Sequence, residues 1–248
     1  GNCPFHNEKT PSFTVSPTKG IYKCFGCGKG GNSITFIMEI EHFNYPEALK
    51  FVAKKYHIEI QEEEMTSEQV KRANEKDSLF IVSTFANDYF KNMLWNSKEG
   101  KAIGLNYFKE RGFSEATIKK FELGYSPKTK ADFSKAALKK AYDKQVLISS
   151  GLSLINERSG EIVDRFSERT IFPIQSYSGR TLGFGGRSFN PKAKAKYLNS
   201  PETLIYHKSK VLYGLNFAKN AISKEQMCYI VEGYTDVISM HQNGIENV

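Results

Sequence analysis

The sequence lacks several features that would assign it to large classes of protein. It has no run of eighteen apolar residues, so we expect no membrane span. Its start, GNCPFHNEKT, contains no charged-then-apolar signal region. Only four of its 248 residues are cysteine, which argues against a disulfide scaffold and indicates a reducing compartment, here expected to be the cytoplasm. Because the chain has no initiator Met and begins and stops within patterns, we expect it to be a piece of a longer protein.

Acidic residues are also in deficit. Asp and Glu number 27 against 35 Lys and Arg, which gives a formal net charge of +8. A basic balance favours a polyanionic partner, most often nucleic acid, although charge alone fits a merely basic soluble protein about as well. The length suits one large domain or two smaller ones, and the apolar fraction of 40% is ordinary for a folded globular protein.

Three of the scarce cysteines are concentrated near the start of the chain. Cys3 and His6 form one pair with two residues between them, and Cys24 and Cys27 form a second such pair after seventeen residues. Two close pairs separated by a loop are typical of a tetrahedral zinc site. Four protein ligands leave no open position, so we expect one Zn2+ with a structural role. Cys228 lies outside the pattern in an apolar run, where we expect a buried thiol.

The segments around these ligands predict a zinc-ribbon-like module. Residues 11–17 and 20–26 are rich in β-branched and aromatic residues and predict strands. Helices are predicted from Asn32 or Ser33 and over 45–60. Lysines interleaved with aromatics on an exposed face would suit single-stranded nucleic acid, whereas aromatics filling a small core are the alternative. The residues concerned are Lys9, Lys19, Lys23, Lys29, Phe13, Tyr22 and Phe25.

The chain should have four parts, and the polar composition of the second part marks the main domain boundary. We expect the zinc-binding module over 1–60, a polar, partly helical linker over 61–78, a core domain over 79–224 and a further α/β segment over 225–248. The core domain should open on an amphipathic helix whose apolar residues recur at steps of three and four. These apolar residues are Leu79, Val82, Phe85, Ala86, Tyr89, Phe90 and Met93.

Cationic side chains gather in a strand-rich stretch from about residue 160 onward. Guanidinium and ammonium groups bind phosphates, so a groove lined by them would hold a template backbone and nucleoside triphosphates. Each cation alone could equally be a solvated surface group. The set comprises Arg165, Arg169, Arg180, Arg187, Lys196, His207 and Lys208. Gly183, Gly185 and Gly186 allow close backbone approach just before Arg187, although a tight β-hairpin would also explain them.

Residues 227–248 predict a strand, a helix and the start of a second strand. The apolar run that ends at Glu232 would place this carboxylate at the carboxyl end of a strand, where α/β sheets carry their active sites. The helix should cover 234–244, with Asp236 near its start. A lone glutamate at such a position is more often a capping group or an ion-pair partner.

Several of these segments resemble a known family. CPFHNEKTPSFTV and YKCFGCGKGGN are similar to the zinc-binding module of bacterial DnaG-type DNA primases. Six further segments resemble the catalytic core of that family, in the same order: YFKERGFSEATIKKFELGYSP, DRFSERTIFPI, GRTLGFGGR, KYLNSPET, YHKSKVLYG and VEGYTD. The resemblance implies a multidomain α+β protein, in which a zinc-ribbon module with packed helices precedes a mixed α/β primase core. Residues 225–248 would then begin a truncated Toprim fold.

The resemblance also implies an activity and its components. A primase joins nucleoside triphosphates into short RNA primers on single-stranded DNA, with an RNA–DNA hybrid as product. Glu232, with Asp236 as a second candidate, would hold catalytic Mg2+ or Mn2+, most of whose ligands would lie beyond Val248, so the chain alone should lack the full catalytic site. The family's replicative helicase would bind through a carboxy-terminal domain. The phosphate-neutralising residues would be Arg165, Arg169, Arg187, Lys196 and Lys208.

Two alternatives stay open at this point. A phage-type primase–helicase would carry the same segments followed by a Walker A motif. A non-catalytic single-strand-binding module would use only the zinc ribbon and the basic groove. A topoisomerase with a Toprim fold would need a tyrosine nucleophile in a separate domain, and the zinc pattern argues against it.

Overall fold

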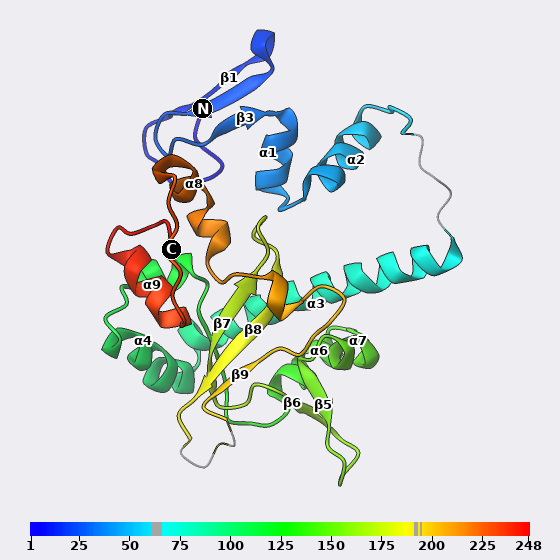
Figure 1. Ribbon diagram of the computed structural model, residues 1–248. Helices are drawn as coiled ribbons and strands as arrows, with labels where there is room; N and C mark the ends of the chain where they lie inside the picture. Colours follow the sequence, from blue (N-terminus) through cyan, green and yellow to red (C-terminus); the bar gives the residue numbers. More distant parts are fainter. Residues whose placement is uncertain (61–65, 191–192, 194) are drawn as a thin grey trace. The chain divides into compact units, whose positions relative to one another are not determined.

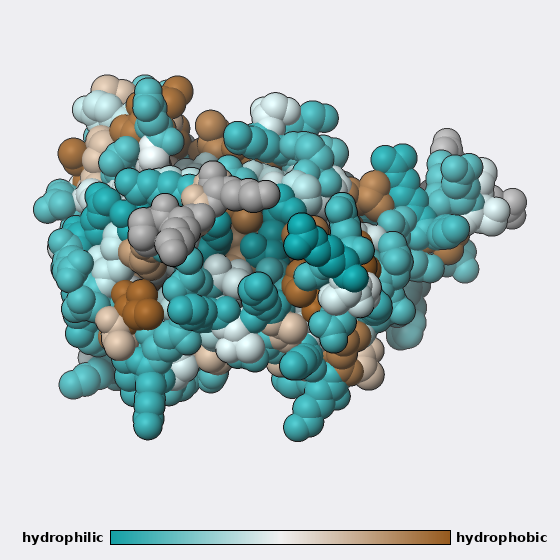
Figure 2. Space-filling view, turned by 90° about the horizontal axis from the view of Figure 1, so that it is seen from below, coloured by the Kyte–Doolittle hydropathy of each residue, from teal (hydrophilic) through white to brown (hydrophobic). Residues whose placement is uncertain are grey.

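The computed structural model describes residues 1–60, 66–190, 193 and 195–248 (Figure 1). The chain divides into two compact units, one of Gly1–Thr66 with Ser178–Arg180 and the other of Ser67–Tyr177 with Thr181–Val248. No helix among these residues is long and apolar enough to span a membrane. The face drawn in Figure 2 is mainly hydrophilic, with hydrophobic residues in small separate areas.

The first unit is built on a three-stranded antiparallel sheet in the order β1-β2-β3. Its elements are β1 (Phe13–Ser16), η1 (Pro17–Lys19), β2 (Ile21–Cys24), β3 (Gly30–Asn32), α1 (Ser33–Ile40) and α2 (Tyr45–Lys55). The Asn32 side chain accepts a hydrogen bond from Thr35 N and so caps α1. Asn44 and Glu47 form a reciprocal capping box at the start of α2. The predicted strands and helix starts are confirmed, although α2 ends before residue 60.

Four aromatic rings form the small core of the first unit. Phe5, Phe13, Tyr22 and Phe36 have ring centroids 5.3 to 6.1 Å apart. Tyr22 is only 5% exposed, whereas Phe25 is 76% exposed. Phe13 and Tyr22 therefore fill the small core, as the alternative prediction had it. Of the three predicted aromatics, Phe25 is the one left exposed to contact nucleic acid.

The second unit surrounds a four-stranded antiparallel sheet in the order β4-β7-β8-β9, beside a two-stranded β5-β6 hairpin. Its strands are β4 (Gly124–Ser126), β5 (Ser153–Ile155), β6 (Ile162–Asp164), β7 (Arg169–Gln175), β8 (Thr181–Ser188) and β9 (Tyr197–Asn199). Its helices are α3 (Ser67–Asn96), α4 (Asn106–Glu110), α5 (Glu115–Lys120), α6 (Asp132–Lys139), α7 (Lys144–Ser149), α8 (Leu215–Glu225) and α9 (Tyr234–Gln242). A π-helical turn, η2 (Gly100–Leu105), and a 3-10 turn, η3 (Lys208–Lys210), complete the list.

Helix α3 confirms the predicted apolar stripe and includes part of the expected linker. Leu79, Val82, Ala86 and Phe90 are buried along one face of this helix. The linker expected at 61–78 was predicted to be partly helical, and its residues from Ser67 onward form the start of α3, which continues without a break into the core. The polar residues of this stretch are good helix formers, and no Gly or Pro interrupts them. Residues 61–65, the rest of the expected linker, lie outside the described residues.

The glycines of β8 serve packing and do not form the hairpin turn. All three lie inside the strand, and the chain between β7 and β8 makes the turn. A Cβ atom on Gly185 would lie 2.4 Å from the Tyr234 ring, and one on Gly183 would lie 3.0 Å from Ser200 Cβ. Only glycine allows these side chains to reach the strand, so the tight-hairpin explanation is wrong.

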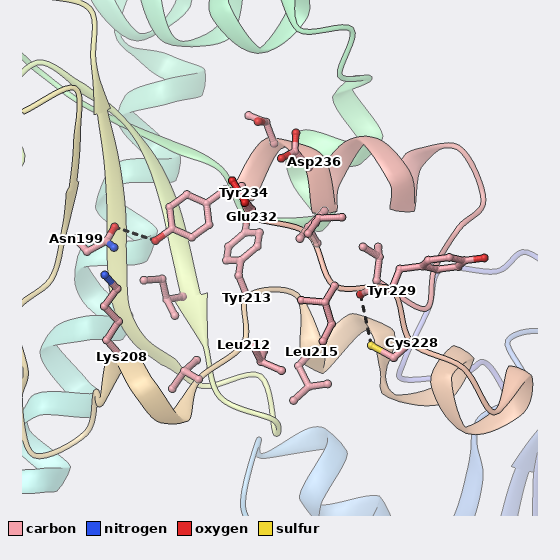
Figure 3. Close-up of a pocket in the computed structure, with 18 of the residues that line it drawn as sticks. Asn199, Lys208, Leu212, Tyr213, Leu215, Cys228, Tyr229, Glu232, Tyr234 and Asp236 are labelled. Carbon is pink, nitrogen blue, oxygen red and sulfur yellow. Dashed lines mark hydrogen bonds between the residues drawn. The ribbon is translucent and has the colours of Figure 1, made fainter.

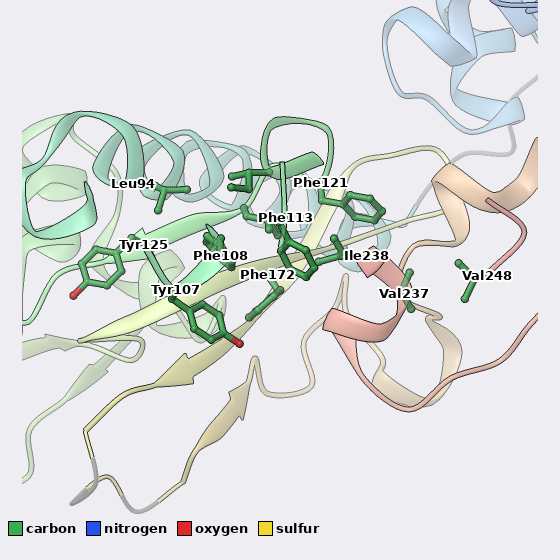
Figure 4. Packing of buried hydrophobic residues seen from close by; sticks show 12 residues of the cluster. Leu94, Tyr107, Phe108, Phe113, Phe121, Tyr125, Phe172, Val237, Ile238 and Val248 are labelled. Atoms are coloured by element: carbon green, nitrogen blue, oxygen red, sulfur yellow. The ribbon is translucent and has the colours of Figure 1, made fainter. Parts of the chain in front are cut away.

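Helix α9 is anchored to the same apolar core as the sheet (Figure 4). Val237 and Ile238 of this helix belong to a buried cluster with Phe121 and with Phe172 of β7. This packing fixes the start of α9, and with it Glu232, relative to the sheet.

The strands predicted on either side of α9 are absent from the described part of the chain. Residues 227–233 and 245–248 are irregular, and one backbone hydrogen bond joins them there, from Tyr229 N to Asn247 O at 2.9 Å. A single bond does not make a ladder, so the apolar run stays uncovered, with Ile230 82% exposed. The expectation of a buried Cys228 is wrong for the same reason, since this thiol is exposed.

The close approach of Tyr234 to β8 generates the first prediction. Gly185→Ala should lower the free energy of unfolding by roughly 1–3 kcal/mol, because the new methyl group overlaps the Tyr234 ring. Urea denaturation of the wild-type and variant chains measures this loss. If the overlap is the cause, the double variant Gly185→Ala, Tyr234→Leu should lose less than the two single losses combined. Strict additivity would show that Tyr234 is not what the methyl group meets.

Candidate functional site

Four side chains of the first unit form a metal-binding cluster. One ligand atom each from Cys3, His6, Cys24 and Cys27 lies within 4.8 Å of all the others. The Cys3 and Cys27 sulfur atoms are 3.8 Å apart, and Zn–S bonds of about 2.3 Å give a tetrahedron edge of about 3.8 Å. His6 Nδ1 faces the cluster, 3.9 Å from Cys24 Sγ. This donor set fits a closed structural Zn2+ site and confirms the four predicted ligands as one cluster.

The local backbone shapes both ligand pairs. Phe5 N and Cys27 N point at the sulfur atoms of Cys3 and Cys24, each at 3.4 Å, so the thiolates accept backbone hydrogen bonds. A Cβ on Gly26 would lie 2.9 Å from His6 Nε2, so glycine leaves room for the imidazole ring. These contacts hold the ligand atoms inward in the arrangement that a tetrahedral metal requires.

Glu8 is a residue of this site that the ligand spacing did not reveal. Its carboxylate accepts hydrogen bonds from Cys3 N at 2.8 Å, from Ser12 N at 3.0 Å and from the Ser12 hydroxyl. The bond from the Ser12 hydroxyl is the main reason that the pKa of Glu8 is lowered. Glu8 also lies 3.2 Å from His6 Nε2, so it can accept the proton on that nitrogen and leave Nδ1 free to bind metal. Its place two residues after His6 was the only signal in the sequence.

In the second unit, Glu232 and Asp236 line an open hollow of about 670 Å³ at the start of α9 (Figure 3). Both carboxylates are exposed, and neither is hydrogen-bonded to another described side chain. Lys208 lines the same hollow. Between them, the Tyr234 hydroxyl donates to Asn199 Oδ1 at 2.8 Å, and burial raises the pKa of Tyr234, which keeps it a neutral donor. We call this the Glu232 hollow.

Arg187 lies in a second open hollow of about 540 Å³. Its guanidinium is held over the rings of Tyr107, at 4.4 Å, and Phe189, at 4.9 Å. Arg187 Nε is buried and has no hydrogen-bond partner among the described residues. Arg111 lines the same hollow and lies over the Tyr107 ring at 5.5 Å. We call this the Arg187 hollow, and a guanidinium held in this way is suited to bind an anion.

The two hollows meet across strands β8 and β9. Arg187 is the direct cross-strand partner of Tyr197, and Tyr197 lines the Glu232 hollow. Directly opposite residues of an antiparallel pair lie with Cβ atoms about 4.5–5.5 Å apart. The sequence did not single out Tyr107, Arg111 or Phe189. The fold brings them together, because α4 carries Tyr107 and ends before Arg111, and Phe189 directly follows β8.

The remaining predicted cations differ in how far their side chains are already engaged by the protein. Arg169 is 8% exposed, and its guanidinium donates to the carbonyls of Gly186, Ala195 and Lys196 at 3.0 to 3.2 Å. Burial lowers the pKa of Arg169, and three of its five N–H donors bind carbonyl oxygens, so it holds backbone in place. Arg165 donates from Nε to Asn199 O at 3.4 Å, and Lys196 is exposed. Arg169 is therefore engaged with the backbone, and a phosphate-binding role for the other cations stays a prediction.

Comparison with known proteins identifies related families. Residues 1–68 match a family described as CHC2 zinc finger, and residues 89–219 match one described as DNA primase catalytic core, N-terminal domain. DNA primases of Clostridium acetobutylicum and Halalkalibacterium halodurans are 45% and 41% identical over 100% of this chain. The chain spans 40% and 41% of the length of these two relatives.

Solved structures give the same result. The zinc-binding and RNA polymerase domains of Aquifex aeolicus primase match with a TM-score of 0.63 and 33% identity, over 100% of this chain and 58% of that one. A DnaG primase catalytic domain bound to single-stranded DNA matches with a TM-score of 0.64 and 34% identity, over 70% of this chain and 55% of that one. The RNA polymerase domain of Mycobacterium tuberculosis primase, in complex with double-stranded DNA carrying a 6-nucleotide overhang, matches with a TM-score of 0.65 and 35% identity, over 69% and 53% of the two chains.

The hydrogen bonds of Glu8 generate the second prediction. Glu8→Gln should weaken zinc affinity by roughly 10- to 100-fold, as expected for loss of the carboxylate that orients a ligating imidazole. Chelator competition measures this affinity, and the absorption spectrum of the Co2+-substituted protein reports the ligand geometry. Glu41→Gln, an exposed acid in the same unit, is the control. Cys24→Ser, which removes a ligand, should lose the metal altogether. Wild-type affinity and spectrum in Glu8→Gln would mean that Glu8 does not orient His6.

Proposed function

The chain belongs to the DnaG-type DNA primase family, and from this we propose that it forms part of an enzyme that synthesises short RNA primers on single-stranded DNA. The reaction is the attack of a ribonucleotide 3′ hydroxyl on the α-phosphorus of an incoming nucleoside triphosphate, with pyrophosphate as the leaving group. The phage-type fusion and the non-catalytic module are not favoured by the comparisons.

The observation that carries the proposal is the Glu232 hollow. Two unengaged carboxylates, Glu232 and Asp236, and one ammonium group, Lys208, line a single open space. This combination suits a triphosphate, because the carboxylates can hold a divalent metal and Lys208 can neutralise phosphate charge. The Tyr234 hydroxyl, donating to Asn199, closes the side of the hollow next to β9.

The residues present fit a divalent cation in part. Mg2+ is usually bound through one or two carboxylates, with water and substrate phosphates in its other positions. Glu232 and Asp236 supply such a pair, while no group of three acids occurs among the described residues. Bound Mg2+ or Mn2+ would stabilise the charge on the attacking and leaving oxygens. Glu232 and Asp236 would hold it at the start of α9, and Lys208 would orient the phosphates.

The Arg187 hollow would bind the template strand. Its two guanidinium groups, from Arg187 and Arg111, offer positive charge, and the rings of Tyr107 and Phe189 hold Arg187 in place. Arg187 Nε has no partner among the described residues, which leaves a buried donor for a phosphate oxygen. The exposed Lys196 would add charge at the end of β9 nearest to Arg187.

The remaining roles rest on family membership. The first unit, with Phe25 exposed and its lysines nearby, would contact single-stranded template near the site of initiation. Family membership implies the replicative helicase as a partner, and the enzyme would act in the cytoplasm.

The buried Nε donor of Arg187, which has no partner among the described residues, generates the third prediction. The affinity for single-stranded DNA falls as salt rises, and Arg187→Ala should make this fall less steep. The magnitude of the slope of log affinity against log salt concentration should drop by roughly 0.7, the value for one phosphate contact. Fluorescence anisotropy with a labelled oligonucleotide across a salt series measures the slope. Arg158→Ala removes the same charge from the exposed β5–β6 turn and is the matched control. Equal effects in the two variants would mean that Arg187 makes no specific phosphate contact.

The carboxylates generate the fourth prediction, and it tests the proposed function. In the complete enzyme, Glu232→Gln should abolish primer synthesis and leave single-stranded DNA affinity nearly unchanged, because it removes a metal-binding charge and keeps the cations. Incorporation of labelled ribonucleotides with Mg2+ measures synthesis. Glu225→Gln, at the exposed end of α8, should keep full activity. Normal synthesis by Glu232→Gln would remove this residue from the chemistry.

A further inference from the structure

A lysine-rich surface lies apart from both hollows. Six lysines occur between residues 128 and 144, and Asp132 and Asp143 are the only acids there, so this stretch carries half of the net charge of +8. All six side chains are exposed. The lysines are Lys128, Lys130, Lys135, Lys139, Lys140 and Lys144. We call this set the lysine surface.

The fold turns these lysines to solvent. Phe133, Ser134 and Ala137 form the buried face of α6, so Lys135 and Lys139 lie on its opposite face. Helix α7 lies beside α6 (Figure 1) and begins at Lys144, after the Asp143 cap. The half-buried Asp164 carboxylate accepts hydrogen bonds from the Phe133 and Ser134 N–H groups in the first turn of α6, so it is engaged with backbone.

The side chains of the lysine surface are not paired with acids, although the Glu99 carboxylate accepts a hydrogen bond from Lys128 N at 2.9 Å. None of its six members makes an ion pair with any residue in the described ranges, and Lys140 has only a contact with the Phe85 ring, at 5.1 Å. Other exposed lysines of the same unit are paired, and these pairs are Lys109–Glu115, Lys120–Glu246 and Lys224–Glu225. A cluster of unpaired like charges produces a positive potential that a polyanion can neutralise.

The composition of the surface selects the kind of polyanion. Proteins that bind single strands place exposed aromatic rings among their cations, and residues 128–144 expose none. Phe133 is buried, and Tyr142 is stacked on Phe85. Lysine also lacks the planar fork with which arginine reads bases, so it suits contacts with phosphates alone. A double helix offers phosphates alone for contact, because its phosphates lie outside and its bases are stacked within.

We propose that the lysine surface binds the phosphate backbone of a nucleic-acid double helix. The identity of this helix rests on the proposed function, and in a primase it is the RNA–DNA hybrid formed by the primer and its template. The surface would hold the hybrid after synthesis by charge alone, without sequence preference.

The test compares two triple variants with the same change in net charge. Lys135, Lys139 and Lys144→Gln neutralise the lysine surface, and Lys109, Lys120 and Lys224→Gln neutralise paired lysines elsewhere in the unit. Anisotropy across a salt series measures affinity for a labelled RNA–DNA hybrid and for single-stranded DNA. For the hybrid, the first variant should reduce the magnitude of the slope of log affinity against log salt concentration by roughly 2.7, about 0.9 per lost contact. It should leave single-strand binding unchanged.

Three outcomes would overturn the proposal. They are equal losses in the two variants, no loss in either, or a loss confined to single-stranded DNA. Circular dichroism of both variants establishes that they are folded. The binding assay needs no catalysis. If the protein makes no primers, the proposed function is wrong, but the measured binding of a double helix by the lysine surface still holds. The two failures are therefore distinguishable.

Discussion

The second unit depends on how closely other residues approach strand β8. Its three interior glycines admit Ser200, the Tyr234 ring and the Arg169 stem to distances that any side chain would block. Tyr234 stacks on Phe172 and begins α9, so its seat against the strand sets the position of the neighbouring Glu232. Arg169 holds the carbonyls of Ala195 and Lys196 and thereby the approach to β9. The glycines of β8 therefore let neighbouring side chains pack directly on the strand, and this packing determines where both hollows lie.

The first unit needs a source of stability other than a large core, since about sixty residues bury little apolar surface. Four aromatic rings supply its small core, and the metal cluster joins the loop before β1 to the end of β2. Glu8 links these two parts, because one carboxylate accepts hydrogen bonds from Cys3 N and Ser12 and also faces His6. Metal binding and folding are therefore expected to be one event in this unit.

Local patterns predicted the features that depend on neighbours in the sequence. The spacing of four ligands, the Asn32 cap and the apolar stripe of α3 all follow from a few adjacent turns, and the structure has them. Features that depend on distant partners were missed or wrong. Arg169 looked like a phosphate ligand because nothing local shows that three carbonyls surround it. Arg111 and Tyr107 lie in a segment that resembles the primase core, but nothing in that segment singles out these two residues. The strand before Glu232 needs a hydrogen-bonded neighbour that the described residues do not supply.

The central claim is that the face joining the two hollows is built to hold nucleic-acid phosphates, with Arg187 as its buried donor. The most direct measurement is the NMR signal of the Arg187 Nε–H group during titration with a single-stranded oligonucleotide. This proton has no partner among the described residues, so binding of a phosphate oxygen should move its resonance and slow its exchange with water. Signals of Tyr197 and Lys208, which line the Glu232 hollow, should move along with it. An unchanged Arg187 signal under conditions where the oligonucleotide is bound elsewhere on the chain would contradict the account.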